Sequence, residues 1–540
     1  MSRSALIAAG SLLLAIGLPL MAVPAPAAVP RAPAAGAEAL IPAHQRDSHW
    51  FRAGAEAVRR AGVAGAGTAK NVIFFLGDGM GVSTVTAARI LAGQQRGGPG
   101  EDYSLSFETL GATGLAKTYN VNSQTADSAG TMSALMTGVK TDIGVFGVDE
   151  RVRRGDCASA RGTQLLSLLD IAELAGRRTG VVSTARLTHA TPGATYARTA
   201  ERGWEDDSGL PAAAREAGCT DIASQFVAHR ERLNRAYGPG ASDGIEVALG
   251  GGRRHFLPAG AGGRRRDGRD LVAEWQAQYP GSLYVQDRDA LAGADRTPLL
   301  GLFAASHMDY ALQRAEPGNG QPSLVDMTVK ALELLAAGDA GYFLMVEAGR
   351  IDHAHHAGNA ANALNETVEL SAAVAAVLER VDLAETLVIV TADHSHVFTM
   401  AGYPRRGNPI LGTVVPADSE EPALDADGRP YTTLGYHNGR GFRDYGDETD
   451  ADITYREPPA SGRRDLREVD TTAPGFHQEA LVPLSSETHG GEDVPVYAGG
   501  PGATGAVGSY EQNRLFHVML QATGWDGVAR RRLRQLDKPR

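Results

Sequence analysis

Five short apolar runs recur along the chain, and helix-like stretches lie between them. The runs cover residues 71–77, 179–183, 341–347, 386–391 and 494–498. Apolar runs of this length are typical of buried strands, and their alternation with helices indicates an α/β fold. We therefore predict a central, mostly parallel sheet flanked by helices on both faces, with a further helix over residues 44–61 ahead of the first strand.

Chemically active side chains follow four of these five runs. Asp78 comes directly after the first run, the polar stretch 184–191 follows the second, and Glu347 ends the third. The pair Asp393-His394 follows the fourth. Because open α/β sheets place their sites at the carboxyl ends of strands, this repetition predicts a functional site at one edge of the sheet.

The composition changes between about residues 403 and 480, where Gly, Pro, Asp and Arg are frequent and apolar runs are short. This change indicates a loop-rich inserted subdomain rather than a part of the central sheet. We expect the α/β core to comprise residues 47–402 and 481–525, the insertion to comprise residues 403–480, and a charged tail to follow at 526–540.

The N-terminus has the features of an export signal. Arg3 precedes an apolar stretch over residues 5–22, and Ala25-Pro26-Ala27 offers a cleavage site of small residues. A membrane anchor is the alternative, since the stretch is nearly long enough to span a bilayer, but the prolines around it favour cleavage. We predict a signal peptide at 1–28, a flexible mature N-terminus at 29–46, and an exported protein, periplasmic or extracellular, without a membrane anchor.

The charge balance limits the range of partners. The 540-residue chain has a net charge of −11, which argues against nucleic acid as a dedicated partner because binding to a phosphate backbone needs a concentrated positive field. The local exception comprises Arg264, Arg265 and Arg266, which glycines flank. We expect these arginines to lie in a solvated loop.

The chain has two cysteines, Cys157 and Cys219. In an exported chain, an even pair is a candidate disulfide. Two buried free thiols are the alternative, and the residues alone leave it open.

Carboxylates and imidazoles gather near the ends of the predicted strands. Zinc favours such mixed nitrogen and oxygen ligands, and thiolates are too few to replace them. Asp352 and His356 share one face of a helix, Asp393 and His394 are adjacent, and His489 lies next to two glycines. His353, His355 and His396 lie beside these residues. Eight other histidines have no partner in the sequence and are expected to be surface or hydrogen-bonded residues: His44, His49, His229, His255, His307, His437, His477 and His517.

Ser128 is a candidate nucleophile. It lies in the segment TADSAGT (125–131), ahead of a helix-like stretch that stops at Gly138. A serine at a helix N-terminus has free backbone N–H groups and the positive end of the helix dipole nearby, which favours an incoming phosphate. A simple N-cap serine is the alternative, and this segment alone favours it.

Four segments taken together resemble the motifs of the alkaline phosphatase family. They are NVIFFLGDGMG (71–81), DSA with TGVK (127–129 and 137–140), VEAGRIDHAHH (346–356) and VTADHSH (390–396), in that family's order. The resemblance extends from about Asp47 to Thr523 and is closer to the animal enzymes than to the enterobacterial one, in which Asp and Lys stand at the positions of His189 and His353. It implies the family's fold, and hydrolysis of phosphate monoesters through a phosphorylated Ser128.

The resemblance also implies two zinc ions, one magnesium ion and a role for each matched residue. The first zinc would be held by Asp352, His356 and His489, and the second by Asp78, Asp393, His394 and the Ser128 oxygen. Asp78, Thr191 and Glu347 would hold the magnesium, with His189 in its outer shell. Arg202 matches the arginine that binds the phosphate, His353 lies behind the phosphate site, and Cys157 and Cys219 match a disulfide of the animal enzymes.

The resemblance also implies what this chain lacks. Animal relatives hold an additional calcium ion, partly on a Glu after a Leu-Phe pair, but Ala304 and Ala305 follow Leu302-Phe303 here. Asp267 is the only acidic residue in the loop 250–268. We therefore expect no calcium. The family implies a homodimer, and the charged C-terminal tail lacks the hydrophobic segment that a lipid anchor requires.

Two alternatives share parts of this pattern. A phosphodiesterase or sulfatase of the same superfamily would have the same metal-centred core, but Arg202 and the magnesium set favour monoesters, and no sulfatase modification motif surrounds Ser128. A non-catalytic protein that binds zinc or phosphate is the alternative from another class. Every catalytic position is filled, which argues against it.

Overall fold

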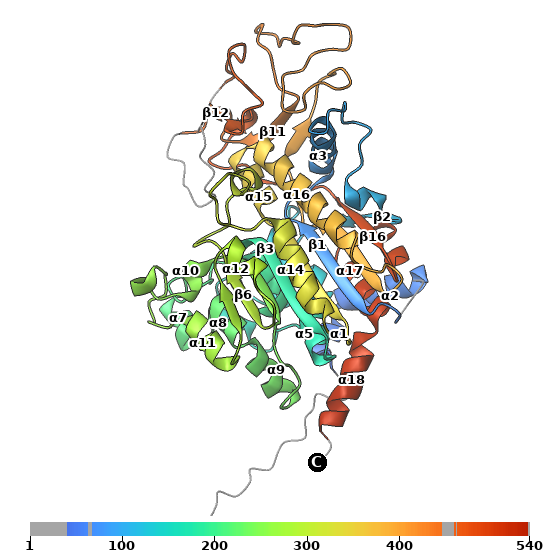
Figure 1. Cartoon of the computed structure of the whole chain (residues 1–540), viewed down its shortest axis with the longest axis vertical. Helices are drawn as coiled ribbons and strands as arrows, with labels where there is room; N and C mark the ends of the chain where they lie inside the picture. Colours follow the sequence, from blue (N-terminus) through green and yellow to red (C-terminus); the bar gives the residue numbers. More distant parts are fainter. Residues whose placement is uncertain (1–39, 63–66, 445–457, 461, 538–540) are drawn as a thin grey trace, which may run out of the picture.

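A ten-stranded sheet runs through the middle of the molecule, which the computed structural model describes over residues 40–62, 67–444, 458–460 and 462–537 (Figure 1). In sheet order the strands are β17 (Gly508–Glu511), β2 (Ala112–Lys117), β16 (Val494–Gly499), β8 (Thr386–Ala392), β1 (Asn71–Gly77), β7 (Tyr342–Ala348), β3 (Arg178–Arg186), β4 (Val247–Gly251), β6 (Leu299–Leu302) and β5 (Leu283–Val285). Neighbouring strands are parallel except for the pairs that β16 makes with β2 and β8. The predicted α/β fold with a mostly parallel sheet is confirmed.

The five predicted strands all lie in this sheet, as β1, β3, β7, β8 and β16. Every residue of β1, β7 and β8 is buried, because helices cover both faces of the sheet there. Central parallel strands therefore have continuous apolar sequences rather than alternating ones. Strand β2 was not predicted, since its sequence ATGLAK is short of large apolar residues and only alternate residues are buried.

Helices cover the sheet in two groups. One group comprises α3 (Val82–Gln94), α14 (Leu324–Ala336), α15 (Arg350–Ala357) and α16 (Ala360–Leu378), and α14 and α16 lie in front of the sheet in Figure 1. The other comprises α4 (Ser128–Thr137), α5 (Leu168–Leu174), α6 (Ala190–Tyr196) and α17 (Arg514–Thr523), which contact one another. The hydrophobic core lies between these groups and the sheet.

Two helices lie close to the start of the described residues, and the first is anchored to the core. Helices α1 (Ala43–Asp47) and α2 (His49–Ala61) precede β1, so the prediction of a flexible segment over 29–46 is wrong for residues 43–46. Gln45 is buried and donates hydrogen bonds to the carbonyl groups of Thr137 and Leu166, at 2.8 and 2.9 Å. The predicted signal peptide at 1–28 lies outside the described residues.

The predicted charged tail at 526–540 is mostly a packed helix. Helix α18 (Trp525–Leu536) buries Trp525, Ala529 and Leu533, and it contacts α5. Arg531 and Arg534 are exposed, whereas Arg532 donates hydrogen bonds to the carbonyl groups of Leu174 and Ala241 in the core, at 3.2 and 2.6 Å. The high charge of the segment is therefore compatible with a packed helix, although its composition alone indicated a tail.

The region predicted as an insertion, 403–480, lies at the top of Figure 1. Its described residues contain little regular structure. A three-stranded sheet of β10 (Phe398–Met400), β11 (Leu434–Gly439) and β14 (Ala480–Pro483) joins it to the core, and β12 (Arg443–Asp444) pairs with β13 (Phe476–His477). None of the helices in the described part of the chain has the length and apolar character needed to cross a bilayer.

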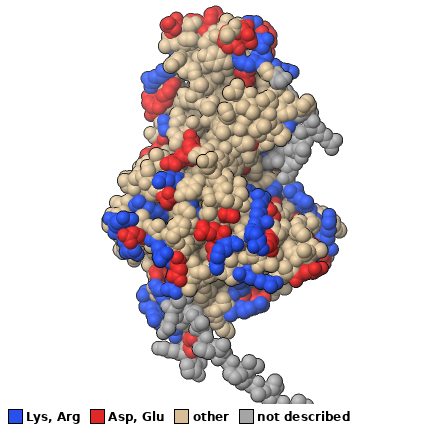
Figure 2. All heavy atoms as spheres, turned by 180° about the vertical axis from the view of Figure 1, so that it is seen from behind, with Lys and Arg blue, Asp and Glu red and all other residues tan. Residues whose placement is uncertain are grey.

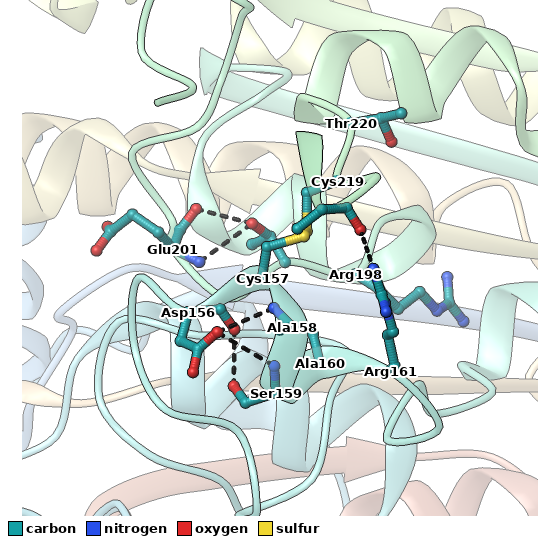
Figure 3. Close-up of a disulfide and its surroundings, with 12 residues drawn as sticks. Asp156, Cys157, Ala158, Ser159, Ala160, Arg161, Arg198, Glu201, Cys219 and Thr220 are labelled. Carbon is teal, nitrogen blue, oxygen red and sulfur yellow. Dashed lines mark hydrogen bonds between the residues drawn. A yellow bond between two sulfur atoms is a disulfide. The ribbon is translucent and has the colours of Figure 1, made fainter. Parts of the chain in front are cut away.

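The two cysteines form a disulfide with Cα atoms 5.9 Å apart (Figure 3). Cys157 begins a short 3-10 helix (Cys157–Ala160), whose N-cap residue Asp156 accepts hydrogen bonds from the N–H groups of Ala158 and Ser159. Cys219 lies shortly after α7 (Ala212–Glu216). The alternative of two free thiols is therefore wrong.

Candidate active site

The carboxyl ends of three neighbouring strands bring buried carboxylates together. Gly77, the last residue of β1, pairs with Ala348 of β7 and with Ala392 of β8. Asp78 and Asp393 directly follow β1 and β8, and Glu347 is the next-to-last residue of β7. All three acidic side chains are fully buried. The sheet therefore concentrates negative charge at this edge.

The turn after Asp78 leaves no room for a side chain at Gly79. Its φ angle is +69°, and a Cβ atom there would lie 2.2 Å from Nε2 of His396. The N–H group of Gly79 donates to Asp393 at 3.0 Å. Glycine thus lets the backbone after β1 approach the other site residues closely.

Asp352, His356 and His489 form the first ligand group. Oδ1 of Asp352 lies 3.4 Å from Nε2 of His356 and 3.3 Å from Nε2 of His489, and the two nitrogens are 3.0 Å apart. Each ring donates through Nδ1 to a backbone carbonyl at 2.7 Å, that of Glu487 for His356 and that of Ala126 for His489. Both Nε2 lone pairs therefore converge on the same point as the carboxylate, which is the arrangement that a zinc ion needs.

Asp78, Asp393 and His394 form the second ligand group. Nε2 of His394 lies 3.4 Å from Oδ1 of Asp78 and 3.4 Å from Oδ2 of Asp393. The hydroxyl of Ser128 lies 3.0 Å from the same Nε2 and 3.4 Å from Oδ1 of Asp78. Ser128 is thus in direct contact with the second ligand group.

Ser128 is the first residue of α4, and it is buried. The N-cap residue is Asp127, whose carboxylate accepts a hydrogen bond from the N–H group of Gly130 at 3.1 Å. The alternative that Ser128 caps this helix is therefore wrong. Its hydroxyl instead points toward Asp78 and His394.

Asp78, His189 and Glu347 form the third ligand group. His189 is the N-cap residue of α6, and Thr191 lies in the first turn of that helix. Buried atoms without a hydrogen-bond partner include Oδ2 of Asp78, Oδ2 of Asp393, Oε1 of Glu347, Oγ1 of Thr191 and Nδ1 of His189. Buried polar atoms normally have partners, and a set dominated by oxygens fits a hard cation.

The charges at this edge are not balanced by protein groups. Burial, together with Asp393, Asp352 and Glu347, raises the pKa of Asp78 well above its usual range. Burial also raises the pKa of Glu347 to about 8, and it raises that of Asp393. Because buried carboxylates stay ionised only when they are paired or bind a cation, these ligand groups fit metal ions.

His396 and Glu487 lie behind the first ligand group, and neither was among the predicted site residues. Nε2 of His396 donates to Asp352 at 3.0 Å, and Nδ1 donates to Glu487 at 2.7 Å. Burial opposes the charged form, but Glu487 and Asp352 outweigh it and raise the pKa of His396 to about 10. The clue in the sequence is the position of His396, two residues after the predicted ligand His394.

Arg202 and His353 lie around the same group of residues. Arg202 donates to the carboxylate of Asp127 at 3.0 Å and to Nε2 of His189 at 3.1 Å. Burial and Arg202 lower the pKa of His189 to about 3, so its ring is neutral and can accept that bond. Nε2 of His353 lies 3.9 Å from Asp352. Apart from the cysteines, the structure brings the predicted site residues into one region.

Two residues outside the motifs have neighbours that the sequence did not indicate. His307, expected to be a surface or hydrogen-bonded residue, accepts a hydrogen bond from the N–H group of Arg186, and its ring centroid also lies 4.0 Å from that of His353 and 5.3 Å from that of His189. The expectation that Arg265 lies in a solvated loop is wrong, because its side chain is buried and pairs with Asp221 and Asp267. Most of these partners are distant in the sequence, so composition did not indicate them.

Comparisons with known proteins agree with this geometry. Residues 69–525 match the family model described as Alkaline phosphatase. The tissue-nonspecific alkaline phosphatase of Gallus gallus is 40% identical over 505 residues, which cover 90% of this chain and 91% of that protein. The Homo sapiens isozyme is 39% identical over 506 residues, 90% of each chain. The membrane-bound alkaline phosphatase of Bombyx mori is 39% identical over 510 residues, 90% of this chain and 87% of its own.

Solved structures show the same fold at lower identity. The alkaline phosphatase of Thermus thermophilus aligns with a TM-score of 0.60 over 92% of this chain and 100% of its own, at 24% identity. That of the Antarctic bacterium TAB5 aligns with a TM-score of 0.55 over 85% of this chain and 99% of its own, at 23% identity. The resemblance to the animal enzymes that the motifs indicate is confirmed, and this chain belongs to the alkaline phosphatase family.

Proposed function

We propose that this chain hydrolyses phosphate monoesters to an alcohol and inorganic phosphate, with Ser128 as the nucleophile. The observation that carries the proposal is the Ser128 hydroxyl, 3.0 Å from Nε2 of His394 and 3.4 Å from Oδ1 of Asp78. A nucleophile in contact with a cation site, at a helix N-terminus that favours phosphate, suits phosphoryl transfer. Relatives named as alkaline phosphatases, about 40% identical over 90% of the chain, support the activity.

The ligand groups suit two zinc ions and one magnesium ion. The first and second groups combine imidazole with carboxylate, which zinc favours. The third group with Thr191 offers mainly oxygen atoms, which magnesium favours, and His189 would lie in the outer shell. Bound cations would favour the ionised form of the Ser128 hydroxyl and stabilise negative charge on the transferring phosphoryl group.

We propose no calcium ion. Calcium prefers several oxygen ligands with more than one carboxylate. Ala304 and Ala305 offer none in their side chains. Asp267, the acidic residue of the loop 250–268, is already paired with the buried guanidinium of Arg265.

The residues of the chain have separate tasks in this reaction. Ser128 loses its proton and attacks phosphorus; the new P–O bond forms as the bond to the alcohol oxygen breaks, and that oxygen takes up a proton. Arg202, held by Asp127, donates hydrogen bonds to the phosphate oxygens, and His353 lies behind them. Water then attacks the phosphoserine, which releases phosphate and restores the Ser128 hydroxyl.

We also propose that the protein is exported, to the periplasm or the medium, and forms a homodimer. The disulfide supports an oxidising compartment. Figure 2 shows a broad area with few charged side chains in the upper half of the molecule, above a lower half of mixed charge. Tyr403 and Leu481 near the insertion are 92% and 77% exposed. Exposed apolar groups of this kind mark protein interfaces.

Turnover of 4-nitrophenyl phosphate tests the proposed function. We expect the wild-type protein to hydrolyse it, to lose activity with a chelator, and to regain it with zinc and magnesium. Ser128→Ala should lose nearly all turnover and keep most of its metal, because Ser128 adds one ligand at most. Mass spectrometry after incubation with phosphate at acidic pH should find phosphoserine at position 128.

The exposed serine of β17, Ser509, provides the control, and Ser509→Ala should behave like the wild type. Phosphate label on another residue, or near-normal turnover in Ser128→Ala, would exclude the assignment. Faster turnover of bis(4-nitrophenyl) phosphate would identify a phosphodiesterase instead.

A further inference from the structure

We propose that His307 is a positioning residue of this site, whose ring holds the imidazoles of His353 and His189 in place. The inference rests on the proposed function, because it concerns the surroundings of the proposed magnesium and phosphate sites. His307 lies in the segment after β6, outside the family motifs that identified the other site residues.

Three imidazole rings form a contiguous cluster beside the third ligand group. The centroid of His307 lies 4.0 Å from that of His353 and 5.3 Å from that of His189, and the last two are 5.4 Å apart. The angles between the ring planes are 55°, 82° and 59°. Tilted and edge-on contacts of this kind are favourable between aromatic rings. Each ring therefore limits the rotation of the other two.

His307 is itself held by Arg186. The N–H group of Arg186, the last residue of β3, donates to Nδ1 of His307 at 3.3 Å, and the guanidinium of Arg186 makes a short contact with Nε2. The same guanidinium donates to both carboxylate oxygens of Glu205, at 2.8 and 2.9 Å. Glu205 also accepts a hydrogen bond from Thr188 at 2.6 Å. Glu205 thus holds the guanidinium of Arg186 in place, and Arg186 in turn holds the ring of His307.

The backbone around His307 is also fixed. The carbonyl of Ser306 accepts from the N–H group of Gly252 at 2.7 Å, and the N–H group of Met308 donates to Thr184 at 3.0 Å. These bonds anchor the segment to β3 and to the turn after β4. Removing the His307 side chain should therefore free its neighbours without releasing the segment.

The two partner rings connect His307 to the reaction. His189 belongs to the third ligand group and accepts a hydrogen bond from Arg202 at 3.1 Å. His353 adjoins Asp352 of the first ligand group. A change in the tilt of either ring would alter the magnesium site or the support of the arginine that binds phosphate. His307 acts through these two rings, so its role is positioning.

Magnesium binding to the zinc-loaded protein, measured by isothermal titration calorimetry, tests the proposal. Loss of a partner behind a metal site typically weakens metal binding by 10-fold or more. We expect His307→Ala to bind Mg²⁺ about 10-fold more weakly than the wild type, with a fall in kcat that exceeds the change in KM. His307→Phe keeps a ring in the cluster and should stay within about twofold of the wild type. His307→Gln keeps a polar atom for Arg186 but no ring, and should resemble His307→Ala.

His44 provides a matched control, because it is also half-buried and makes one hydrogen bond, to the carbonyl of Gln164 at 2.9 Å. His44→Ala should bind Mg²⁺ like the wild type. If His307→Ala folds poorly, His307→Gln decides the question. Wild-type affinity in both ring-free variants, or affinity in His307→Phe as weak as in His307→Ala, would overturn the proposal. Absence of wild-type turnover would refute the proposed function instead, since the calorimetry needs no turnover.

Discussion

His356 and His489 each use one ring nitrogen on a backbone carbonyl of the protein. The bonds from Nδ1 to Glu487 and Ala126 fix the tautomer and leave Nε2 as the free lone pair. Both rings therefore face Asp352 in one orientation before any ion binds. Because the rings are already oriented, replacing Asp352, His356 or His489 should remove one metal ligand without moving the other two.

His489→Ala should lose one zinc ion per chain, because it removes one of three ligands and leaves Ser128 and Asp78 in place. Elemental analysis after dialysis should find zinc and magnesium near two to one in the wild type, with calcium at background. The variant should retain about one zinc ion and turn over at least about 10-fold more slowly. His437→Ala, at an exposed histidine of the insertion, is the control. Full zinc retention in the variant would remove His489 from the ligands, and stoichiometric calcium would contradict the argument from Ala304.

Glu173, at the amino-terminal edge of the sheet, is a buried acid away from the metal groups. It accepts hydrogen bonds from Thr179, Ser242 and Gly244. Burial outweighs these bonds and raises its pKa from 4.5 to about 7. The folded protein therefore holds this proton more tightly than the unfolded chain does. The protonated Glu173 thereby contributes on the order of 3 kcal/mol to the free energy of unfolding. This contribution is fully present below about pH 4.5 and is lost as the pH rises through 7.

Glu173→Gln should abolish the loss of stability that Glu173 causes at rising pH. Relative to the wild type, the free energy of unfolding of the variant should increase between pH 5 and pH 9, because the amide cannot ionise. Denaturant unfolding at several pH values measures the difference, with Glu231→Gln as the control at a side chain that is 65% exposed. A constant difference between wild type and variant across this range would show that Glu173 ionises normally.

At the scale of elements, local pattern decided which strands could be predicted. Strand β1 is buried on both faces, so its apolar run is continuous and easily recognised. Strand β4 ends in Gly250 and Gly251, which weaken the pattern of a strand. A Cβ atom at Gly251 would lie 2.2 Å from the carbonyl of Ser306, so a contact distant in the sequence requires the glycine. The antiparallel direction of β16 likewise depends on its neighbours and not on its own residues.

The candidate site was predictable where its residues stand in motifs at the ends of strands. The residues behind them were not. His396 and Glu487 are 91 residues apart in the sequence, and no local pattern links them. His307 has no motif of its own and gains its neighbours only when β6 lies at its place in the sheet. Contacts between distant residues therefore account for what the sequence did not indicate.

The disulfide should stabilise the fold measurably, because it joins two surface segments that are 62 residues apart. Closing a loop of this length restricts the unfolded chain by on the order of 4 kcal/mol. The double variant Cys157→Ser with Cys219→Ser should unfold at a clearly lower denaturant concentration. Thiol titration of the unfolded, unreduced wild type should find no free thiol. Two reactive thiols, or an unchanged unfolding midpoint, would contradict this expectation.

At the scale of the whole molecule, an apolar edge strand offers a surface for a second chain. Strand β14 is an edge of the three-stranded sheet, and its Leu481 and Val482 are 77% and 40% exposed. Exposed apolar edge strands readily associate. We expect light scattering to find a dimer, and Leu481→Glu to shift it toward a monomer. Leu536→Glu, at a leucine of α18 that is 44% exposed, should leave the dimer intact. A monomeric wild type at micromolar concentration would refute the homodimer.

The ligand groups connect parts of the chain that are synthesised far apart. Ser128 and His394 are 266 residues apart, and His356 and His489 are 133 residues apart. No ligand group is therefore complete in a chain that has assembled only its first half, because each group contains a residue from Glu347 onward. Binding lowers the free energy of the completed fold and of no earlier species. Metal binding would thus be one of the last steps of folding. A chain that misfolds around any of these ligand residues would remain metal-free, inactive and easier to unfold.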